Sequence, residues 1–249
     1  MPTYSGTSGN DSMTGSTSND TMDGGSGNDV LYGGDGNDSL QGGSQKDTLY
    51  GGNGADTLDG GSENDTLVGG TGADSLIGGA GIDMADYSAS DAGVTVNIVT
   101  GAASGGHASG DTLTGIEDLT GSAYSDTLTG DSARNVLYGG AGNDQIFGGG
   151  GDDDFFGGAG NDSVYAGSGN DIIDAGDGSD SIWFGLGNDV IYAGGGNDYV
   201  DDQDGTWLVG DQTIYGGAGN DYLRHGDGND VVYGGDGNDT INEIGRAHV

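Results

Sequence analysis

The chain has 249 residues, of which 60 are glycine, and its 41 acidic against 4 basic side chains give a formal charge of -37. This charge disfavours nucleic acid and anionic membranes as partners and favours cations, while the absence of cysteine excludes disulfides and thiolate metal sites. A chain so polar and so rich in glycine would ordinarily stay unfolded, because apolar burial cannot offset its conformational entropy.

The N-terminus, M-P-T-Y-S-G-T-S-G-N-D, has neither the basic region nor the apolar core of a signal peptide. No stretch is long enough to insert into and span a bilayer.

A nine-residue period begins at residue 6, and nine consecutive units run through residues 6–86, within a first block 1–86. Typical units read G-G-S-G-N-D-V-L-Y and G-G-D-G-N-D-S-L-Q.

The first six positions of each unit predict a turn, because glycine reaches positive φ without penalty and asparagine tolerates it. The last three positions predict a short strand with position eight facing a thin core. Each strand is expected to pair with the strand two units away, so that one coil takes 18 residues and the fold is an all-β parallel solenoid. The position-eight residues of the two long blocks are Met13, Met22, Leu31, Leu40, Leu49, Leu58, Leu67, Leu76, Ala85, Leu128, Leu137, Ile146, Phe155, Val164, Ile173, Ile182, Ile191 and Val200.

Residues 87–120 interrupt the period and predict a β-rich spacer between blocks. Its segment V-T-V-N-I-V alternates, which predicts a longer strand with Val94, Val96 and Ile98 on one face. The stretch D-T-L-T-G-I-E-D-L-T-G-S favours a structural cap or joint rather than a site.

The second block of nine units covers residues 121–201, and a third block of three units covers 216–242. In the linking segment 202–215, residues 202–206 read as an insertion and residues 207–215 as a degenerate repeat with Gln212 in the aspartate position. The end, 243–249, reads E-I-G-R-A-H-V, and its back-translation resembles a sequencing adapter. We therefore expect an artefactual tail on a truncated gene, whose continuation would carry the secretion signal and any effector domain.

Position six is aspartate in 20 of the 21 clear units, and the exception is Asn135. Stacking every second turn brings these carboxylates into two files, which repel unless a cation lies between successive turns. Ca²⁺ accepts six to eight oxygen ligands in irregular geometry, whereas Mg²⁺ requires a strict octahedron. The predicted metal ligands are Asp11, Asp20, Asp29, Asp38, Asp47, Asp56, Asp65, Asp74, Asp83, Asp126, Asp144, Asp153, Asp162, Asp171, Asp180, Asp189, Asp198, Asp221, Asp230 and Asp239.

The number of gaps between turns predicts about 15 Ca²⁺ ions, whose charge of about +30 would offset most of the formal charge of -37. The metal is therefore interpreted as part of the fold. Uncovered carbonyl groups in the glycine turns are expected to join the carboxylates as ligands.

The pattern G-G-x-G-x-D-x-apolar-x resembles that of the RTX (repeats-in-toxin) proteins, with their haemolysin-type calcium-binding repeats. The resemblance implies a right-handed parallel β-roll, with Ca²⁺ held by aspartates and turn carbonyls of units n and n + 2. It also implies type I secretion from a bacterium through an uncleaved C-terminal signal, and hence an extracellular location. Departures from the pattern at Gln45, Lys46, Glu63 and Asn135 are expected to impair individual sites.

Aromatic residues at position nine are expected to form ladders on the outer faces, because Phe147, Tyr165 and Trp183 are each 18 residues apart. Packing between coils is the simpler interpretation, and a docking strip for a glycan or a partner domain is the alternative. The shorter ladders are Tyr138 with Phe156, Tyr32 with Tyr50, and Tyr215 with Tyr233.

No catalytic motif is present: His107, His225 and His248 are scattered, and neither H-E-x-x-H, G-x-S-x-G nor G-x-G-x-x-G occurs. We therefore expect no catalytic residues and no enzymatic activity. One hypothesis is a calcium-binding structural or secretion module of an adhesin or surface protein. The other is the repeat domain of a larger secreted protease, lipase, epimerase or toxin.

Overall fold

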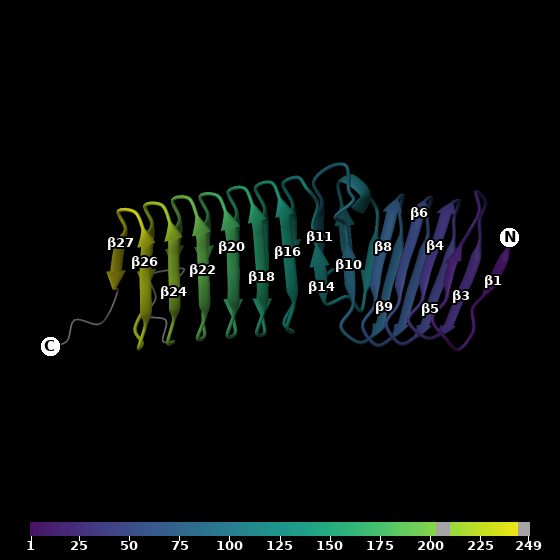
Figure 1. The fold of residues 1–249 in the computed structure, drawn as a ribbon, viewed down its shortest axis with the longest axis horizontal. Helices are drawn as coiled ribbons and strands as arrows, with labels where there is room; N and C mark the ends of the chain where they lie inside the picture. Colours follow the sequence, from purple (N-terminus) through teal and green to yellow (C-terminus); the bar gives the residue numbers. More distant parts are fainter. Residues whose placement is uncertain (203–209, 244–249) are drawn as a thin grey trace. The chain divides into compact units, whose positions relative to one another are not determined.

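The computed structural model describes residues 1–202 and 210–243, and it divides into two compact units, Met1–Ala123 and Tyr124–Val249. Each unit is a stack of short strands with almost no helix (Figure 1). Residues 203–209 and 244–249 lie outside the described part, and with them lie most of the expected insertion and of the expected artefactual tail. No helix in the described ranges is long and apolar enough to cross a membrane.

Unit 1 has two sheets, with strand orders β1-β3-β5-β7-β9-β13-β12-β11 and β2-β4-β6-β8-β10-β14. A single turn of 3-10 helix, η1 (Gly106–Ala108), precedes β13. The strands are β1 (Thr3–Ser5), β2 (Ser12–Thr14), β3 (Thr21–Ser26), β4 (Val30–Asp35), β5 (Ser39–Ser44), β6 (Thr48–Asn53), β7 (Thr57–Ser62), β8 (Thr66–Thr71), β9 (Ser75–Ala80), β10 (Met84–Asp86), β11 (Thr95–Asn97), β12 (Ala102–Ser104), β13 (Thr112–Thr114) and β14 (Asp118–Thr120).

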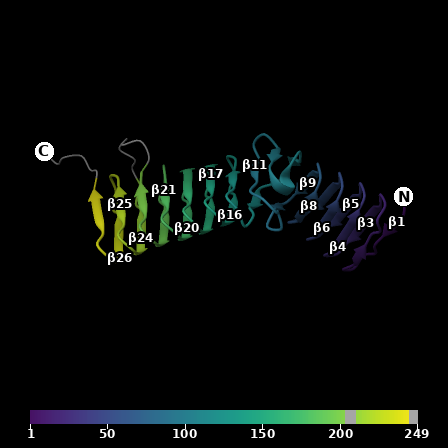
Figure 2. The same ribbon diagram turned by 90° about the horizontal axis from the view of Figure 1, so that it is seen from above.

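Unit 2 also has two sheets, with strand orders β15-β17-β19-β21-β23-β25-β27 and β16-β18-β20-β22-β24-β26. Viewed from above, the strands of each unit follow one another as rungs (Figure 2). The strands are β15 (Thr127–Thr129), β16 (Val136–Ala141), β17 (Gln145–Gly150), β18 (Asp154–Ala159), β19 (Ser163–Ser168), β20 (Ile172–Asp177), β21 (Ser181–Trp183), β22 (Val190–Gly195), β23 (Tyr199–Asp201), β24 (Thr213–Ala218), β25 (Tyr222–His225), β26 (Val231–Asp236) and β27 (Thr240–Glu243).

The pairing register confirms the coil of 18 residues. In unit 1, Leu40 of β5 pairs with Met22 of β3 and with Leu58 of β7, and the strands are parallel. In unit 2, Ile146 of β17 pairs with Val164 of β19 in the same way. Every second strand therefore lies in the same sheet, as expected for a parallel solenoid.

The strands are longer than expected, and the prediction of a six-residue turn is wrong. β5 continues from position seven of one unit through position three of the next, so that only positions four to six form the turn. The two glycines of the consensus thus belong to the sheet, where Gly43 pairs with Gly25 and with Gly61. The second glycine of each pair lets the strand bend at positive φ, 112° at Gly43, while its backbone stays paired.

Position-eight side chains form the core, as predicted. Leu49 and Phe155 are fully buried, at 0% exposure. The core is less complete at the ends of the described stacks, where Met13 is half-buried and Ile241 is 48% exposed.

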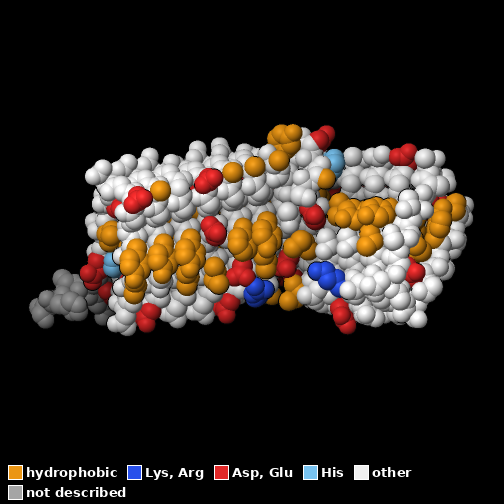
Figure 3. Space-filling model, in the orientation of Figure 1, with side chains coloured by type: hydrophobic (Ala, Val, Ile, Leu, Met, Phe, Trp, Pro, Cys, Tyr) orange, Lys and Arg blue, Asp and Glu red, His pale blue; other side chains and the backbone are white. Residues whose placement is uncertain are grey.

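Aromatic residues at position nine stack between coils, also as predicted. Hydrophobic side chains form rows on the face of the molecule seen in Figure 3. Phe147, Tyr165 and Trp183 stack at centroid distances of 4.8 and 4.4 Å with nearly parallel rings. In the other sheet of unit 2, Tyr215 stacks between Tyr192 and Tyr233 at 5.0 and 5.1 Å. These contacts support packing between successive coils.

Part of the expected spacer extends the stacks of unit 1. Leu113 of β13 pairs with Leu76 of β9, and Leu119 of β14 pairs with Ala85 of β10. The expected longer strand is only the three residues of β11, which forms an antiparallel pair with β12. Val94 and Val96 are buried, as expected, whereas Ile98 is half-buried in the following turn.

Candidate metal centres

The position-six aspartates form two files in unit 1, one on each edge of the coils. In the first file, the N–H of Asp29 donates to Asp47 Oδ1 at 2.7 Å, and the N–H of Asp47 donates to Asp65 Oδ1 at 2.7 Å. In the second file, the N–H of Asp20 donates to Asp38 Oδ1 at 2.7 Å. One oxygen of each carboxylate therefore fixes its turn to the turn 18 residues earlier.

The second oxygen of most of these carboxylates is buried and has no hydrogen-bond partner. Such an acceptor costs free energy unless a donor or a cation satisfies it. These orphaned Oδ2 atoms belong to Asp29, Asp38, Asp47, Asp56, Asp65, Asp74, Asp83, Asp144, Asp153, Asp162, Asp171, Asp180, Asp189, Asp198 and Asp221.

Carbonyl oxygens border the same spaces as the orphaned oxygens. A Cβ placed on Gly24 would lie 2.5 Å from Asp29 Oδ2 and 2.6 Å from the carbonyl oxygen of Gly42, which lies in β5 of the next coil. In unit 2, a Cβ on Gly139 would lie 2.5 Å from Asp144 Oδ2 and similarly close to a carbonyl oxygen. Glycine at position one thus leaves open a pocket lined by a carboxylate and a carbonyl, which are the hard oxygen ligands that Ca²⁺ accepts.

The sites need carbonyl groups because carboxylates alone are too few. Among residues 1–202 and 210–243, no group of three or more acidic or histidine side chains is placed to hold a metal ion. Each gap is instead bordered by aspartates of two successive turns together with backbone oxygens. This donor set fits Ca²⁺ better than it fits a metal that prefers nitrogen or sulfur ligands.

Charge balance also favours bound cations. Twenty-one aspartates are buried in the described part of the chain, whereas the whole chain has 4 lysines and arginines. An ionised carboxylate in a low-dielectric environment is costly unless it is paired. The residues present therefore fit a group of bound divalent cations.

Five of the predicted ligands lack the orphaned oxygen. Asp11 Oδ2 accepts from the N–H of Thr7 at 2.6 Å, and Asp20 Oδ2 accepts from the N–H of Ser16 at 2.6 Å. The other three are Asp126, which is buried, Asp230, which pairs with His225, and Asp239, which is half-buried in the last turn.

Three further residues continue the files. Asp111 Oδ1 accepts from the N–H of Asp74 at 2.7 Å, and Glu117 Oε2 accepts from the N–H of Asp83 at 2.9 Å. Neither residue was predicted from the sequence, although D-T-L-T at Asp111 repeats the D-x-apolar-x signal of the regular units. Gln212 holds the aspartate position as predicted, since its Oε1 accepts from the N–H of Asp189 at 2.7 Å.

The non-consensus turns keep the backbone of the regular turns. Gln45 and Glu63 replace glycine at position four and adopt φ of 78° and 73°, a region that costs side-chain-bearing residues strain. Asp47 and Asp65 in the same turns remain buried with an orphaned Oδ2. In the turn of Asn135, the side-chain oxygen accepts from the N–H of Asp131 at 2.8 Å.

Burial raises the pKa of carboxyl groups in the files above the ordinary value. For Asp65, burial and then the charges of Asp83 and Asp47 raise the pKa to about 7, although the hydrogen bond from the Asp47 backbone lowers it. Burial likewise raises the pKa of Asp144 to about 7 and that of Asp47 to about 6. Without cations, the stacked fold therefore binds protons more tightly than an unfolded chain does.

This difference predicts an acid-induced gain of β structure in chelator. A carboxyl group with a raised pKa stabilises the fold below its unfolded pKa of 3.8, and this contribution is lost as pH rises through 6 to 7. We expect circular dichroism of the chelated chain to show more β structure at pH 5.5 than at pH 8, both above the pI of about 4.1. In saturating Ca²⁺ the spectrum should be the same at both values, and equal spectra in chelator would contradict the linkage.

The sequence of the chain matches a known protein family. The family model for the RTX calcium-binding nonapeptide repeat matches most of the chain in several copies. No curated protein matches the chain. The matched segments are residues 5–40, 32–67, 50–85, 111–146, 120–155, 147–182, 185–201 and 209–241.

Proposed function

Because the chain belongs to the RTX calcium-binding nonapeptide-repeat family, we propose that it binds Ca²⁺ between every second turn and that it folds on this metal. The observation that carries the proposal is the set of buried Asp Oδ2 atoms without a hydrogen-bond partner. Each ion would be held by carboxylates of two successive aspartates in a file, such as Asp47 and Asp65, and by turn carbonyls. The chain would bind about 15 ions in all, since each regular gap supplies one such set.

A single-residue test uses Asp47, which borders the gaps to Asp29 and Asp65. Asp47→Asn keeps a side-chain oxygen for the backbone hydrogen bond but removes the charge. We expect the number of bound Ca²⁺ ions, counted by native mass spectrometry, to fall by about two, because Ca²⁺ binds amide oxygens more weakly than carboxylates. Asp91→Asn is the matched control, since its side chain is 82% exposed and outside the files. An equal count for the two variants would reject the assigned ligands.

We further propose that the chain is secreted by a bacterial type I pathway and folds outside the cell as a structural module of an adhesin or surface protein. Family membership and calcium affinities of about 10⁻⁴–10⁻³ M for extracellular modules support this, because cytosolic calcium would then leave the chain unfolded for export. The alternative is the repeat domain of a larger secreted enzyme or toxin. The gene sequence on either side of this chain separates them: a catalytic motif there favours the alternative, and additional repeats and spacers favour the structural module.

The aromatic ladders favour a packing role over a glycan-binding role. Sugars stack on the faces of aromatic rings, but in the ladder of Tyr192, Tyr215 and Tyr233 the inner ring has both faces covered by neighbours at 5.0 and 5.1 Å. Only the ring edges and polar hydroxyl groups of Tyr215 are left for a partner. We therefore assign the ladders to coil-to-coil packing. Because the sequence contains no catalytic motif, we also propose no enzymatic activity for the chain.

The last coils of the 249-residue chain should open more easily than the others. Val232 is half-buried and Ile241 is 48% exposed, whereas Leu49 is fully buried. Stability in repeat proteins is approximately a sum over contacts between neighbouring repeats. These coils bury less apolar surface against their neighbours and are therefore less stable. Hydrogen exchange in saturating Ca²⁺ should show faster exchange for residues 216–242 than for 24–77 and 139–200. Equal protection in all three ranges would contradict the nearest-neighbour picture.

A further inference from the structure

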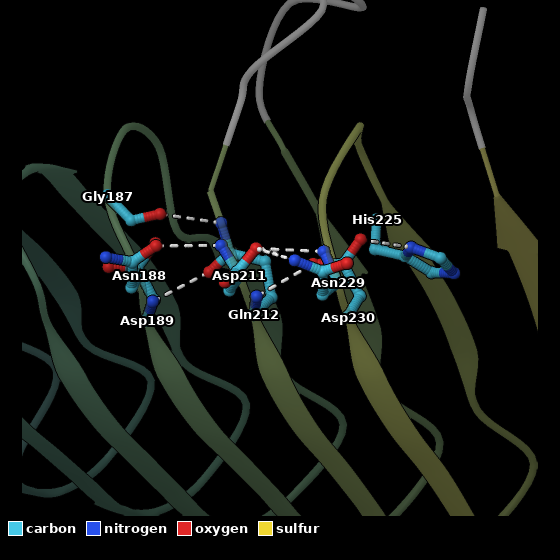
Figure 4. Close-up of polar contacts among 8 residues, drawn as sticks. All are labelled: Gly187, Asn188, Asp189, Asp211, Gln212, His225, Asn229 and Asp230. Atoms are coloured by element: carbon cyan, nitrogen blue, oxygen red, sulfur yellow. Dashed lines mark hydrogen bonds and ion pairs between the residues drawn. The ribbon is translucent and has the colours of Figure 1, made fainter.

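One edge of unit 2 contains two gaps that differ from every regular gap. The file on this edge runs through Asp153, Asp171 and Asp189, whose Oδ2 atoms are all orphaned, and then through Gln212 and Asp230. Figure 4 shows this last part of the file, with Gln212 between Asp189 and Asp230. Neither Gln212 nor Asp230 has an orphaned side-chain atom.

At the first gap, an amide replaces the carboxylate. Gln212 is 3% exposed, and its Oε1 keeps the hydrogen bond from the N–H of Asp189 at 2.7 Å. Its Nε2 takes the place of the second carboxylate oxygen and donates to the carbonyl oxygen of Gly187 at 2.9 Å. An amide nitrogen has N–H donors and no lone pair for a cation. The amide nitrogen therefore forms a direct hydrogen bond with a carbonyl group of the preceding turn, in the place where a cation would bind it.

At the second gap, which lies beside Asp230, an imidazole binds the carboxylate. Asp230 Oδ1 accepts from the N–H of Gln212 at 2.7 Å, as in a regular turn. Its Oδ2 lies 2.9 Å from Nδ1 of His225, and the two side chains are 3% and 13% exposed. His225 stands at position one of its unit, where regular units have the glycine whose missing side chain leaves the metal pocket open.

We propose that the gaps beside Gln212 and Asp230 hold no Ca²⁺ at these two side chains, which instead form direct hydrogen bonds with Gly187 and His225. This inference rests on the proposed function, because it identifies two positions in a file of aspartates at which the proposed Ca²⁺ ions are absent. At the first gap an amide donor stands in place of a carboxylate oxygen, and at the second the carboxylate is bound by a ring at position one. Asp230, predicted from the sequence as a ligand, is thereby reassigned as the acceptor for His225.

The consequence is a calcium-independent joint within a calcium-dependent stack. Across this joint β24 still pairs with β22 and with β26 in register, Ile214 lying opposite both Ile191 and Val232. On the opposite edge, the regular file continues from Asp198 to Asp221, whose Oδ2 atoms are orphaned. The coils at the joint are therefore linked by cations on one edge and by side-chain hydrogen bonds on the other.

The test is to rebuild the regular turns. The double variant Gln212→Glu and His225→Gly supplies a carboxylate and reopens the pocket, so we expect native mass spectrometry at saturating Ca²⁺ to count one or two more ions than for the wild type. Gln145→Glu, the same change at an exposed strand position, is the control and should leave the count unchanged. A folded double variant with the wild-type count would overturn the inference.

A second variant keeps the test decisive if the double variant does not fold. Gln212→Ala removes the amide and adds no charge, so the ion count should stay at the wild-type value if the gaps are empty of calcium. A lower count would overturn the inference, because it would show that the wild-type gaps hold ions. A wild-type chain that binds no Ca²⁺ at all would instead reject the proposed function, so the two failures are distinguishable.

Discussion

In chelator at pH 8, we expect the chain to give the circular dichroism spectrum of a coil, and millimolar Ca²⁺ to convert it to a β spectrum. The reason is the burial of 21 aspartates in the described residues, many of them in files of like charge. At pH 8 these groups are ionised in the unfolded chain, and stacking them without cations would bury uncompensated charge. We therefore expect folding and metal binding to be a single event, as in other small metal-dependent folds.

The titration should be cooperative, because each ion joins two turns and each turn borders two gaps. Mg²⁺ at the same concentration is the control, and it should recover less β structure since it keeps its water and requires octahedral geometry. A spectrum that is already fully β in excess chelator at pH 8 would show that the orphaned carboxylates need no cation.

Gly61→Ala should separate the coils of unit 1 at β7. Gly61 has a φ of 108°, and a Cβ there would overlap the carbonyl oxygen of Gly43 in the neighbouring coil. The left-handed backbone alone costs a residue with a side chain about 1–3 kcal/mol, and relieving the overlap requires the paired strands β5 and β7 to move apart. We expect a loss of at least this size in the free energy of unfolding, measured by urea titration in saturating Ca²⁺.

Gly9→Ala is the matched control for this change. Gly9 lies in a turn of the same unit, and a Cβ there meets nothing within 4 Å. A surface substitution of this kind usually changes stability by less than about 0.5 kcal/mol. Equal stabilities for the two variants would show that the close approach of coils at position two does not limit the fold.

The regular part of this fold follows from the sequence because one short rule generates it. A period of nine with an apolar residue at position eight determines the core, and alternate units determine the pairing of Met22 with Leu40 and of Leu40 with Leu58. The same rule places Asp29, Asp47 and Asp65 in one file. Each of these statements needs only side-chain alternation and parallel stacking.

The departures could not be read from the period, because they depend on contacts between distant residues. Asp111 joins a file across 37 residues, and the hydroxyl of Tyr87 donates to its Oδ2 at 3.1 Å. The donors that close the gaps at Gln212 and Asp230 are an amide and a ring whose positions in space the repeat does not specify. The extent of the strands was missed for a related reason, since glycine pairs favour turns locally and only inter-coil hydrogen bonding recruits them into a sheet.

The links in the files that span more than 18 residues bear on how such proteins can gain residues and can be engineered. The N–H of Asp198 reaches Asp221 Oδ1 at 3.0 Å across 23 residues, five more than the usual 18, and Asp74 reaches Asp111 across 37. In both cases the extra residues are accommodated while the files remain in register. Register is thus set by pairing between turns and not by the length of chain between them. A gene can therefore acquire foreign segments within these longer links. A designer can likewise graft a loop or a small domain there, with the calcium-binding scaffold on either side unchanged.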